Sequence, residues 1–469
     1  MTTINLFAKE SSNFFFSEGK LPMEEKLTNL SHLFVTIFLS GLSNFMVFPV
    51  ITDVTMLALC PGQDQCSLAI YLTGFQQAMT GIGSVVITPI IGNLSDQYGR
   101  KAMLTIPLTV SIFPLAILAY SSETNFFYSY YVLRTLTAMV SESSIQCLAF
   151  AYVADNISER QRASAFGIQS GIFSSSFVAG TLAARLLSIS LTFQVAALVS
   201  MVATVYMRIF LKDRVSDNEN LSEPILKSSG PEENIHQDNA HTNNLTTRVS
   251  PVSSSKKILT VGDLICLLKR SSTFSQVSVV SFFNSLAEGG LLASFMYYLK
   301  ARFHFSKNQY ADLLLLTGVA GMASQLIFMP LLVPIISEEK LLSIGLFMGF
   351  IQMLLCSIAW SNWVPYASTA LTVFTVLVQP SLRSITSKQV GPNEQGKAQG
   401  CISSISSFAN IISPLIFSPL TALFLSEEAP LKFPGFSILC IGFALLIGFI
   451  QSIMIKASIQ KNKSNTILA

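Results

Sequence analysis

Ionisable side chains within long apolar runs are the residues of this chain best placed to do chemistry. Arg134 and Glu142 share one run, eight residues and therefore about two helical turns apart, on roughly the same face. Asn284 and Glu288 share a later run with i, i+4 spacing, which also puts them on one face, and two glycines follow. Because charged groups inside a bilayer are costly, each is a candidate functional residue.

The chemistry that these groups support is proton uptake and release. A carboxylate in an apolar site binds a proton more readily than one in water, and a nearby arginine has the opposite effect. Movement of Glu288 relative to Arg134 would therefore couple conformation to a proton. Arg134 has a second interpretation, as a static charge satisfied by helix carbonyls and neighbouring polar side chains. Glu142, nearer the inner end of its run, also fits a snorkelled side chain or a gate-forming salt bridge.

Uncharged polar residues in other apolar runs are further candidates to contact a substrate. They are Asn44, Gln76 and Gln169. Small polar side chains in membrane helices also hold helices together, so both roles stay open.

Several other chemistries lack the residues that they need. The sequence has no convincing nucleophile–base arrangement, no Cys/His cluster with metal-ligand spacing and no P-loop lysine motif. We therefore expect no enzyme, no metal and no cofactor, and transport driven by a gradient. Cys60 and Cys66 lie six positions apart in a loop predicted to be outside, where an oxidising compartment would allow a disulfide.

The elements that must position these residues are membrane helices. Of the 469 residues, 51% are hydrophobic and only 12% are charged, which excludes an ordinary soluble domain. The net charge of +3 is too small to indicate a nucleic-acid partner. The expected surroundings are the lipid bilayer.

Twelve apolar runs of about 20 residues or more are each long enough to cross the hydrocarbon core. They lie near 33–53, 67–92, 102–120, 126–150, 164–186, 189–211, 274–299, 311–336, 341–360, 363–382, 398–424 and 433–456. The fold class is therefore an all-α membrane protein of two six-helix bundles. The similar turns Glu159–Ala163 and Glu394–Ala398, at equivalent places in the two halves, indicate an internal repeat.

The domain boundaries follow from the same pattern. We expect a cytosolic N-terminal tail (1–31), an N-terminal bundle (32–211), a disordered cytosolic linker (212–258), a C-terminal bundle preceded by a short amphipathic segment (259–457) and a cytosolic C-terminal tail (458–469). The linker is predicted from its polar composition, which cannot bury a core.

Basic residues in short loops predict the orientation, because Lys and Arg favour the cytosolic side. With both termini cytosolic, the inside loops hold Arg100, Lys101, Arg160, Arg162, Lys340, Arg383, Lys388 and Lys397. Lys300, Arg302 and Lys307 are an exception on the outside. Residues 263–268 fit either an acidic dileucine sorting signal or an amphipathic helix on the inner surface. The plasma membrane and a vacuolar or endosomal membrane both stay open.

A polar segment between the second and third runs predicts a tight cytosolic hairpin with a conformational role. It comprises Gly92, Leu94, Asp96, Gly99, Arg100 and Lys101 in the pattern G-x-L-x-D-x-x-G-R-K. The glycines allow close approach or positive φ, and Asp96 offers a carboxylate to a helix N-terminus. This pattern resembles the signature after the second helix of major facilitator superfamily transporters.

A second resemblance covers the tenth and eleventh runs. Gln379-Pro380 to Val390, with Glu394 to Gly396 and Pro414, is similar to the tetracycline-efflux and hippocampus-abundant-transcript-like branch. The resemblance implies a twelve-helix transporter that works by alternating access about a midplane cavity. Ser40 stands at or near the position where tetracycline exporters carry a first-helix acid, and only Gly180 is kept from their fifth-helix glycine pattern.

The sequence thus predicts a monomeric secondary transporter of a small organic solute, with the proton as coupling ion. The alternative is a non-transporting membrane sensor or partner-binding protein that retains the fold. The missing first-helix acid favours this alternative.

Overall fold

The structure is a computed structural model that describes residues 23–59, 67–121, 123–212, 271–426 and 429–468. Every regular element in these ranges is helical. Apolar segments of this length satisfy their backbone hydrogen bonds internally as helices, which is what a lipid environment requires. The linker predicted at 212–258, the amphipathic segment before α10 and the Cys60–Cys66 pair lie outside the described residues, apart from Lys212.

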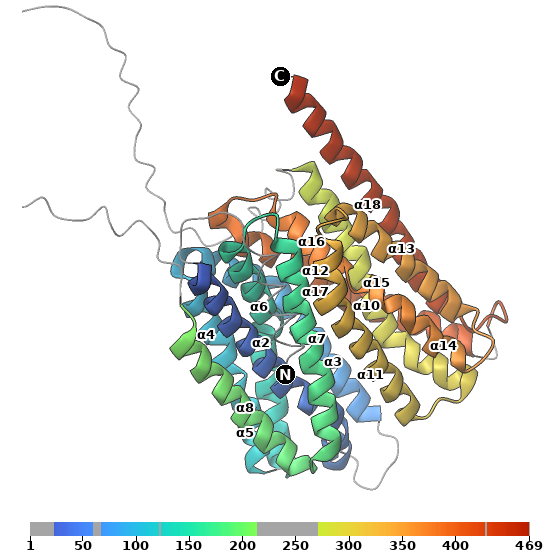
Figure 1. The fold of residues 1–469 in the computed structure, drawn as a ribbon. Helices are drawn as coiled ribbons and strands as arrows, with labels where there is room; N and C mark the ends of the chain where they lie inside the picture. Colours follow the sequence, from blue (N-terminus) through green and yellow to red (C-terminus); the bar gives the residue numbers. More distant parts are fainter. Residues whose placement is uncertain (1–22, 60–66, 122, 213–270, 427–428, 469) are drawn as a thin grey trace, which may run out of the picture.

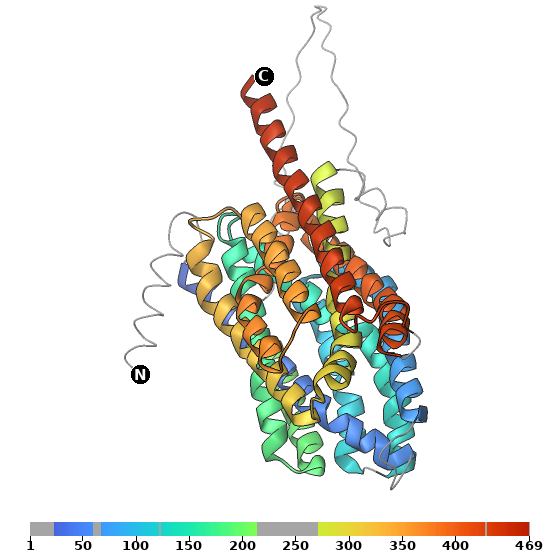
Figure 2. The ribbon, with the colours of Figure 1, turned by 90° about the vertical axis from the view of Figure 1, so that its right-hand side faces the viewer.

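The two halves of the chain form two helical bundles that lie side by side (Figures 1 and 2). The first half contains α2 (Met23–Leu59), α3 (Ser67–Tyr98), α4 (Arg100–Val110), α5 (Ile112–Tyr120), α6 (Thr124–Asn156), α7 (Arg162–Leu186) and α8 (Ile189–Phe210). The second half contains α10 (Ser272–Phe303), α11 (Lys307–Ala323), η2 (Ser324–Phe328), α12 (Met329–Leu332), α13 (Glu338–Ser357), α14 (Trp363–Ser368), η3 (Thr369–Leu371), α15 (Thr372–Thr375), α16 (Val378–Ser387), η4 (Pro392–Glu394), α17 (Gln395–Leu425) and α18 (Phe436–Leu468).

Ten helical stretches among the described residues are long and apolar enough to cross a membrane. The α4–α5 and α11–η2–α12 series each count as one of these stretches. Helix α7, with 25 residues, and the interrupted series from α14 to α16 are not among these ten and lie where two further crossings are predicted from the sequence. The predicted all-helical membrane fold is confirmed.

Each half has its own apolar core, and two seams join the halves. Leu33, Leu148 and Phe166 belong to one core, and Tyr298, Phe417 and Ile441 belong to the other. Along one seam α3 packs on α17, and along the other α7 packs on α11, η2 and α12. The contacts that must change when the halves move relative to each other therefore lie along these two seams.

The tenth crossing is broken because proline interrupts its hydrogen bonding. Pro380 has no backbone N–H, so the carbonyl of Val376 loses its partner four residues on. Gln325 compensates by donating from Nε2 to that carbonyl at 3.2 Å, and Ser324 Oγ donates to the Val373 carbonyl. Both donors lie in the π-helical turn η2 of the neighbouring crossing.

The turn predicted at Gly92–Lys101 is present, but it is much shorter than its polar residues indicated. Helix α3 continues through Tyr98 and α4 begins at Arg100, so only Gly99 is not helical, with a φ of 91° that favours glycine. The polar residues of this segment stay helical because their side chains find partners within the protein. The reach of the tenth crossing was wrong, since α16 continues to Ser387 and includes Arg383, which was expected in a loop.

The first and last helices are longer than a crossing needs. Helix α2 starts at Met23, within the predicted N-terminal tail, and α18 runs to Leu468, through most of the predicted C-terminal tail. They contain 37 and 33 residues, whereas about 20 suffice to span the hydrocarbon core. Figure 1 shows α18 projecting beyond the other helices.

Candidate functional site

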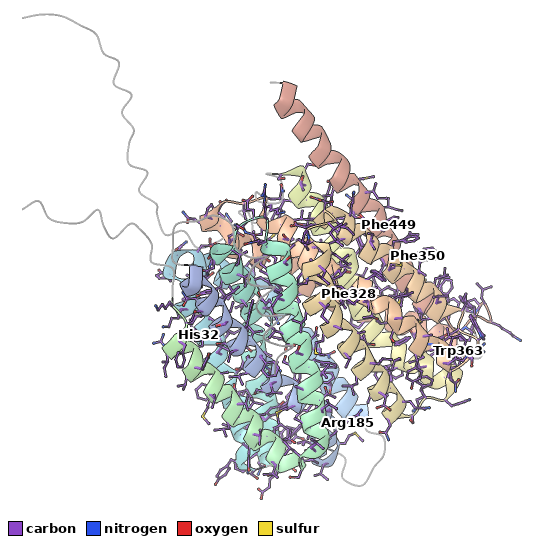
Figure 3. The ribbon with its side chains drawn as sticks, in the orientation of Figure 1. His32, Arg185, Phe328, Phe350, Trp363 and Phe449 are labelled. Atoms are coloured by element: carbon purple, nitrogen blue, oxygen red, sulfur yellow. The ribbon has the colours of Figure 1, made fainter. Side chains whose placement is uncertain are left out.

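The two ends of the bundle differ in how the halves meet. We call them the Gly99 end, where α3 meets α4 and where α17 begins, and the Arg185 end, at the other end of α7. Figure 3 labels Arg185 near the lower edge of the bundle. The polar contacts between the halves can be placed relative to these two ends.

At the Gly99 end, Asp96 of α3 accepts two backbone hydrogen bonds from the other half. The N–H groups of Gly396 and Lys397, in the first turn of α17, donate to its two carboxylate oxygens at 2.9 Å each. These N–H groups have no partner within their own helix, and the positive end of the helix dipole also favours a carboxylate. Asp96 therefore connects the halves through main-chain atoms.

Arg100 holds that carboxylate in place from the same half. Its guanidinium pairs with Asp96 and contacts Ser95, and its Nε donates to Asp155 at the end of α6 at 2.8 Å. All three charged side chains are at least nine-tenths buried. The arginine thus links α3, α4 and α6 behind the inter-half contact, while Leu94 and Lys101 are half-buried beside it.

Glycines let α3 and α17 approach backbone to backbone at this end. A Cβ on Gly92 would overlap the carbonyl of Gly396, and a Cβ on Gly396 would overlap the carbonyl of Gly92. One turn further, a Cβ on Gly400 would lie 2.9 Å from the Cα of Pro89. Any larger residue at these positions must separate the helices.

Two more contacts between the halves lie at the Gly99 end. Arg162 of α7 donates to the carbonyl of Ser387, at the end of α16, at 3.2 Å. Cys147 of α6 is fully buried, with its Sγ 3.9 Å from the carbonyl of Gly396. Lys388 and Glu338, both in the second half, pair at 2.7 Å nearby.

The predicted polar residues of the first half are only partly brought together. Arg134 of α6 is half-buried and donates to Asn44 of α2 at 3.5 Å, and Asn44 in turn donates to the Ser40 carbonyl at 3.0 Å. Glu142 is exposed and has no ion-pair partner among the described residues. Gln169 is fully buried with neither end of its amide hydrogen-bonded to a described residue.

Gln76 of α3 is half-buried, and its Nε2 is a buried atom that has no hydrogen-bond partner in the described part of the chain. It is therefore not joined to the Arg134–Asn44 contact.

In the second half, Glu288 is the centre of a polar group that spans two helices. Asn284, one turn earlier on α10, donates to its carboxylate at 2.9 Å. Gln379 of α16 lies 3.5 Å from both carboxylate oxygens. Glu288 lies deep among protein atoms and still has solvent-accessible surface. The carboxylate is thus reachable by water-sized groups, and the side chains of Asn284 and Gln379 define its surroundings.

Sequence reasoning missed Arg383, which stands one helical turn after Gln379 on α16. It was assigned to a loop because the apolar run stops at 382, although the Ser-Ile-Thr-Ser stretch that follows remains helical. The i, i+4 spacing from Gln379 was the available signal. Gln325 was also missed. It accepts from Ser174 of the other half at 2.8 Å.

The Arg185 end has a single polar contact of this kind among the described residues. Arg185 of α7 pairs with Asp312 of α11 at 3.2 Å, and the two side chains are 43% and 58% exposed. In the same described ranges, no group of His, Cys, Asp and Glu side chains could hold a metal ion.

Comparison of the sequence with known proteins finds one matching family and several distant relatives. The sequence model described as Major Facilitator Superfamily matches residues 33–414. The human hippocampus abundant transcript-like protein 1 is 24% identical over 367 residues, which cover 76% of this chain and 66% of that protein. The class C tetracycline resistance protein of Escherichia coli is 22% identical over 353 residues, covering 74% of this chain and 80% of that protein.

A solved structure also resembles this one. The crystal structure of the human organic anion transporter MFSD10 (TETRAN) has a TM-score of 0.72 with 16% sequence identity. The match covers 92% of this chain and 100% of that chain. At this identity the likeness shows the fold alone.

Proposed function

Because the chain belongs to the Major Facilitator Superfamily, we propose that it is a secondary active transporter that moves a small organic solute across a membrane by alternating access. It is an integral multi-pass membrane protein of a family of transporters, not enzymes. The observation that carries the proposal is the unequal closure of its two ends. Contacts between the halves are buried at the Gly99 end, whereas the accessible carboxylate of Glu288 lies between the ends.

The residues Gly92, Leu94, Asp96, Gly99, Arg100 and Lys101 form the conformational latch of this cycle. Asp96 binds the first turn of α17 only while the halves meet at the Gly99 end, since the donors and the acceptor belong to different halves. Rocking of the halves would break both hydrogen bonds at once. The polar segment therefore stabilises one of the two states that a transporter must alternate between.

Glu288 is the coupling group for the proton, and Asn284 and Gln379 position it. A carboxylate in this setting can exchange its proton with water that reaches it, so the charge of the second half changes with the protonation of Glu288. The placement of lysine and arginine supports a cytosolic Gly99 end and cytosolic termini. The working unit is the monomer, because each monomer holds both halves.

Reconstituted uptake tests this proposal. A panel of small organic solutes would be screened for thermal stabilisation of the purified full chain, and each stabilising solute would be tested for flux into proteoliposomes with and without a proton gradient. We expect gradient-dependent flux of at least one solute. Glu288→Gln should remove the dependence on the gradient, whereas Glu123→Gln, a control at an exposed acid, should keep it.

Two outcomes would contradict the proposal at different levels. Undiminished, equally gradient-dependent flux in Glu288→Gln would remove Glu288 from coupling and leave transport intact. Stabilisation without flux of any solute would favour the second candidate function, a sensor or partner-binding protein. The observation behind that candidate is Ser40, a buried hydroxyl residue at or near the place of the exporters' first-helix acid.

A further inference from the structure

Arg383 is a buried cation whose hydrogen-bond partners are all neutral. The side chain belongs to a residue that is 7% exposed, and its Nη1 donates to the Gln399 carbonyl at 3.2 Å, to Gln399 Oε1 at 3.1 Å and to Ser403 Oγ at 2.9 Å. Within the described part of the chain no carboxylate hydrogen-bonds to it. A buried charge without a bonded counter-charge is costly and calls for a function.

One edge of the guanidinium is unused. All of the hydrogen bonds given above come from Nη1, and Nε is buried without a partner among the described residues. The edge that contains Nε is one of those through which arginine makes two parallel hydrogen bonds to a carboxylate. The protein thus leaves open a donor that a carboxylate would use.

The opposite half covers this cation with an aromatic ring. The guanidinium carbon lies 4.8 Å from the ring centroid of Phe150 on α6, a favourable cation–π distance. Phe150 packs edge-on against Phe166 of its own half, with ring centroids 5.3 Å apart. Gln399 and Ser403, in contrast, belong to α17 and to the same half as Arg383.

Opening of the Gly99 end would therefore remove only one of the partners of Arg383. Phe150 would leave with the first half, whereas the bonds to Gln399 and Ser403 would move together with the arginine. The cation would then face the opened space with its Nε edge free.

We propose that Arg383 binds the carboxylate group of the transported solute once the Gly99 end opens, and that Phe150 takes the place of that group in the closed state. The proposal rests on the alternating-access function proposed above and adds the chemical class of the solute, an organic acid in its anionic form. It also gives Phe150 a role, since its cation–π contact stabilises the Arg383 guanidinium when no solute is bound.

A competing role for Arg383 is that of a distant counter-charge for Glu288. The two charges interact electrostatically although the structure gives them no direct hydrogen bond. In that case neutralising both residues would restore what neutralising one removes. The two roles therefore predict different behaviour of the double variant.

Protection from an arginine reagent tests the site without requiring transport. Purified full-length protein would be treated with phenylglyoxal, and the adduct at Arg383 would be followed by peptide mass spectrometry. The probes are acids paired with their primary amides, from acetate and acetamide to benzoate and benzamide. We expect at least one acid to slow modification of Arg383 about tenfold, as a charge-assisted bidentate contact would, and its amide to have no effect. Modification of the exposed Arg185 is the internal control.

Variants sharpen the result. Arg383→Gln should abolish the preference for acids over amides in thermal stabilisation, Arg383→Lys should keep part of it, and Arg185→Gln should keep all of it. Phe150→Leu retains the cation and removes its cover, so it should bind the acid several-fold more tightly. This variant keeps the test valid if Arg383→Gln does not fold.

Three results would overturn the assignment: no acid protects Arg383, acids and amides protect equally, or Glu288→Gln/Arg383→Gln regains the acid preference that Arg383→Gln loses. Uptake separates this site from the proposed function. If acids protect Arg383 but no solute is transported, the binding site is supported and the transport function is rejected. If acids and amides are transported equally and no acid protects Arg383, transport is supported and the binding site is rejected.

Discussion

The Gly99 end and the Arg185 end hold the same two halves together by different means. At the Gly99 end, Asp96 and Asp155 are buried and both are bonded to Arg100 of their own half, and Asp96 also accepts two main-chain hydrogen bonds from the other half. At the Arg185 end, the pair of Arg185 and Asp312 is about half exposed. Removing one partner of a buried, bonded charge network costs about 3–5 kcal/mol, whereas an exposed pair contributes about 0–1 kcal/mol.

This difference indicates that polar contacts at the Gly99 end stabilise the closed arrangement of the two halves more than the ion pair at the Arg185 end does. The Gly99 end must break buried polar contacts to open, whereas the ion pair that the Arg185 end must break is exposed. Substitutions of the same chemical type should therefore have effects that depend on the end at which they are made. Cys147, fully buried beside Gly396, is a built-in reporter of opening at the Gly99 end.

The largest effect is expected from Asp96→Asn. The change leaves Arg100 without one of its two carboxylates and weakens the hydrogen bonds to α17, at a cost of about 3–5 kcal/mol. Alkylation of Cys147 by N-ethylmaleimide, followed by peptide mass spectrometry, should accelerate by about two to four orders of magnitude. Asp312→Asn is the matched control at the other end, and equal rates in the two variants would remove the contrast.

Gly396→Ala should have the next largest effect, because its Cβ would overlap the backbone of α3. Overpacking of this kind costs about 1–3 kcal/mol. The rate of Cys147 alkylation should rise with it, while Gly391→Ala, a glycine with no atom within 4 Å of the added Cβ, should behave as wild type. A tolerated alanine at 396 would mean that the helices have room that the structure does not show.

Arg162→Gln should have an effect of about the same size as Gly396→Ala, at the same end. It removes a hydrogen bond from a charged donor to the Ser387 carbonyl, worth about 1.5–3 kcal/mol before compensation by water. Spin labels at the exposed positions 160 and 340, one in each half, would report the separation of the halves by double electron–electron resonance spectroscopy. We expect a second, longer distance to appear. If the distribution of label-to-label distances is unchanged, the difference between the Gly99 end and the Arg185 end depends only on the contacts of α3 with α17.

Arg185→Gln should have the smallest effect. The exposed pair with Asp312 contributes about 0–1 kcal/mol, and salt screens it further. Thermal unfolding in low and high salt should therefore differ little between the variant and wild type. A loss of stability larger than that of Asp96→Asn would reverse the comparison between the two ends.

The sequence was sufficient for the fold because length and apolarity define a membrane helix. It also drew attention to Glu288, since charges are rare in such helices, and to Asp96 as part of the polar segment, although the roles of both residues stay predictions. It did not reveal the partners of Asp96, because main-chain N–H groups carry no side-chain signal and Gly396 is 300 positions away. It placed Arg383 in a loop because polar residues that follow an apolar run look like its end, although here they are buried between helices.

The π-helical turn at Ser324–Phe328 has a consequence for how the eighth crossing tolerates change in length. One extra residue in a helix rotates everything after it by about 100°. That rotation brings Met329 onto Gly167, where a Cβ on the glycine would collide with it. Deleting a single residue from this turn would restore regular α-helical hydrogen bonding but rotate Met329 away from Gly167. The π-helical turn therefore sets which residues of α12 face α7 along the second seam.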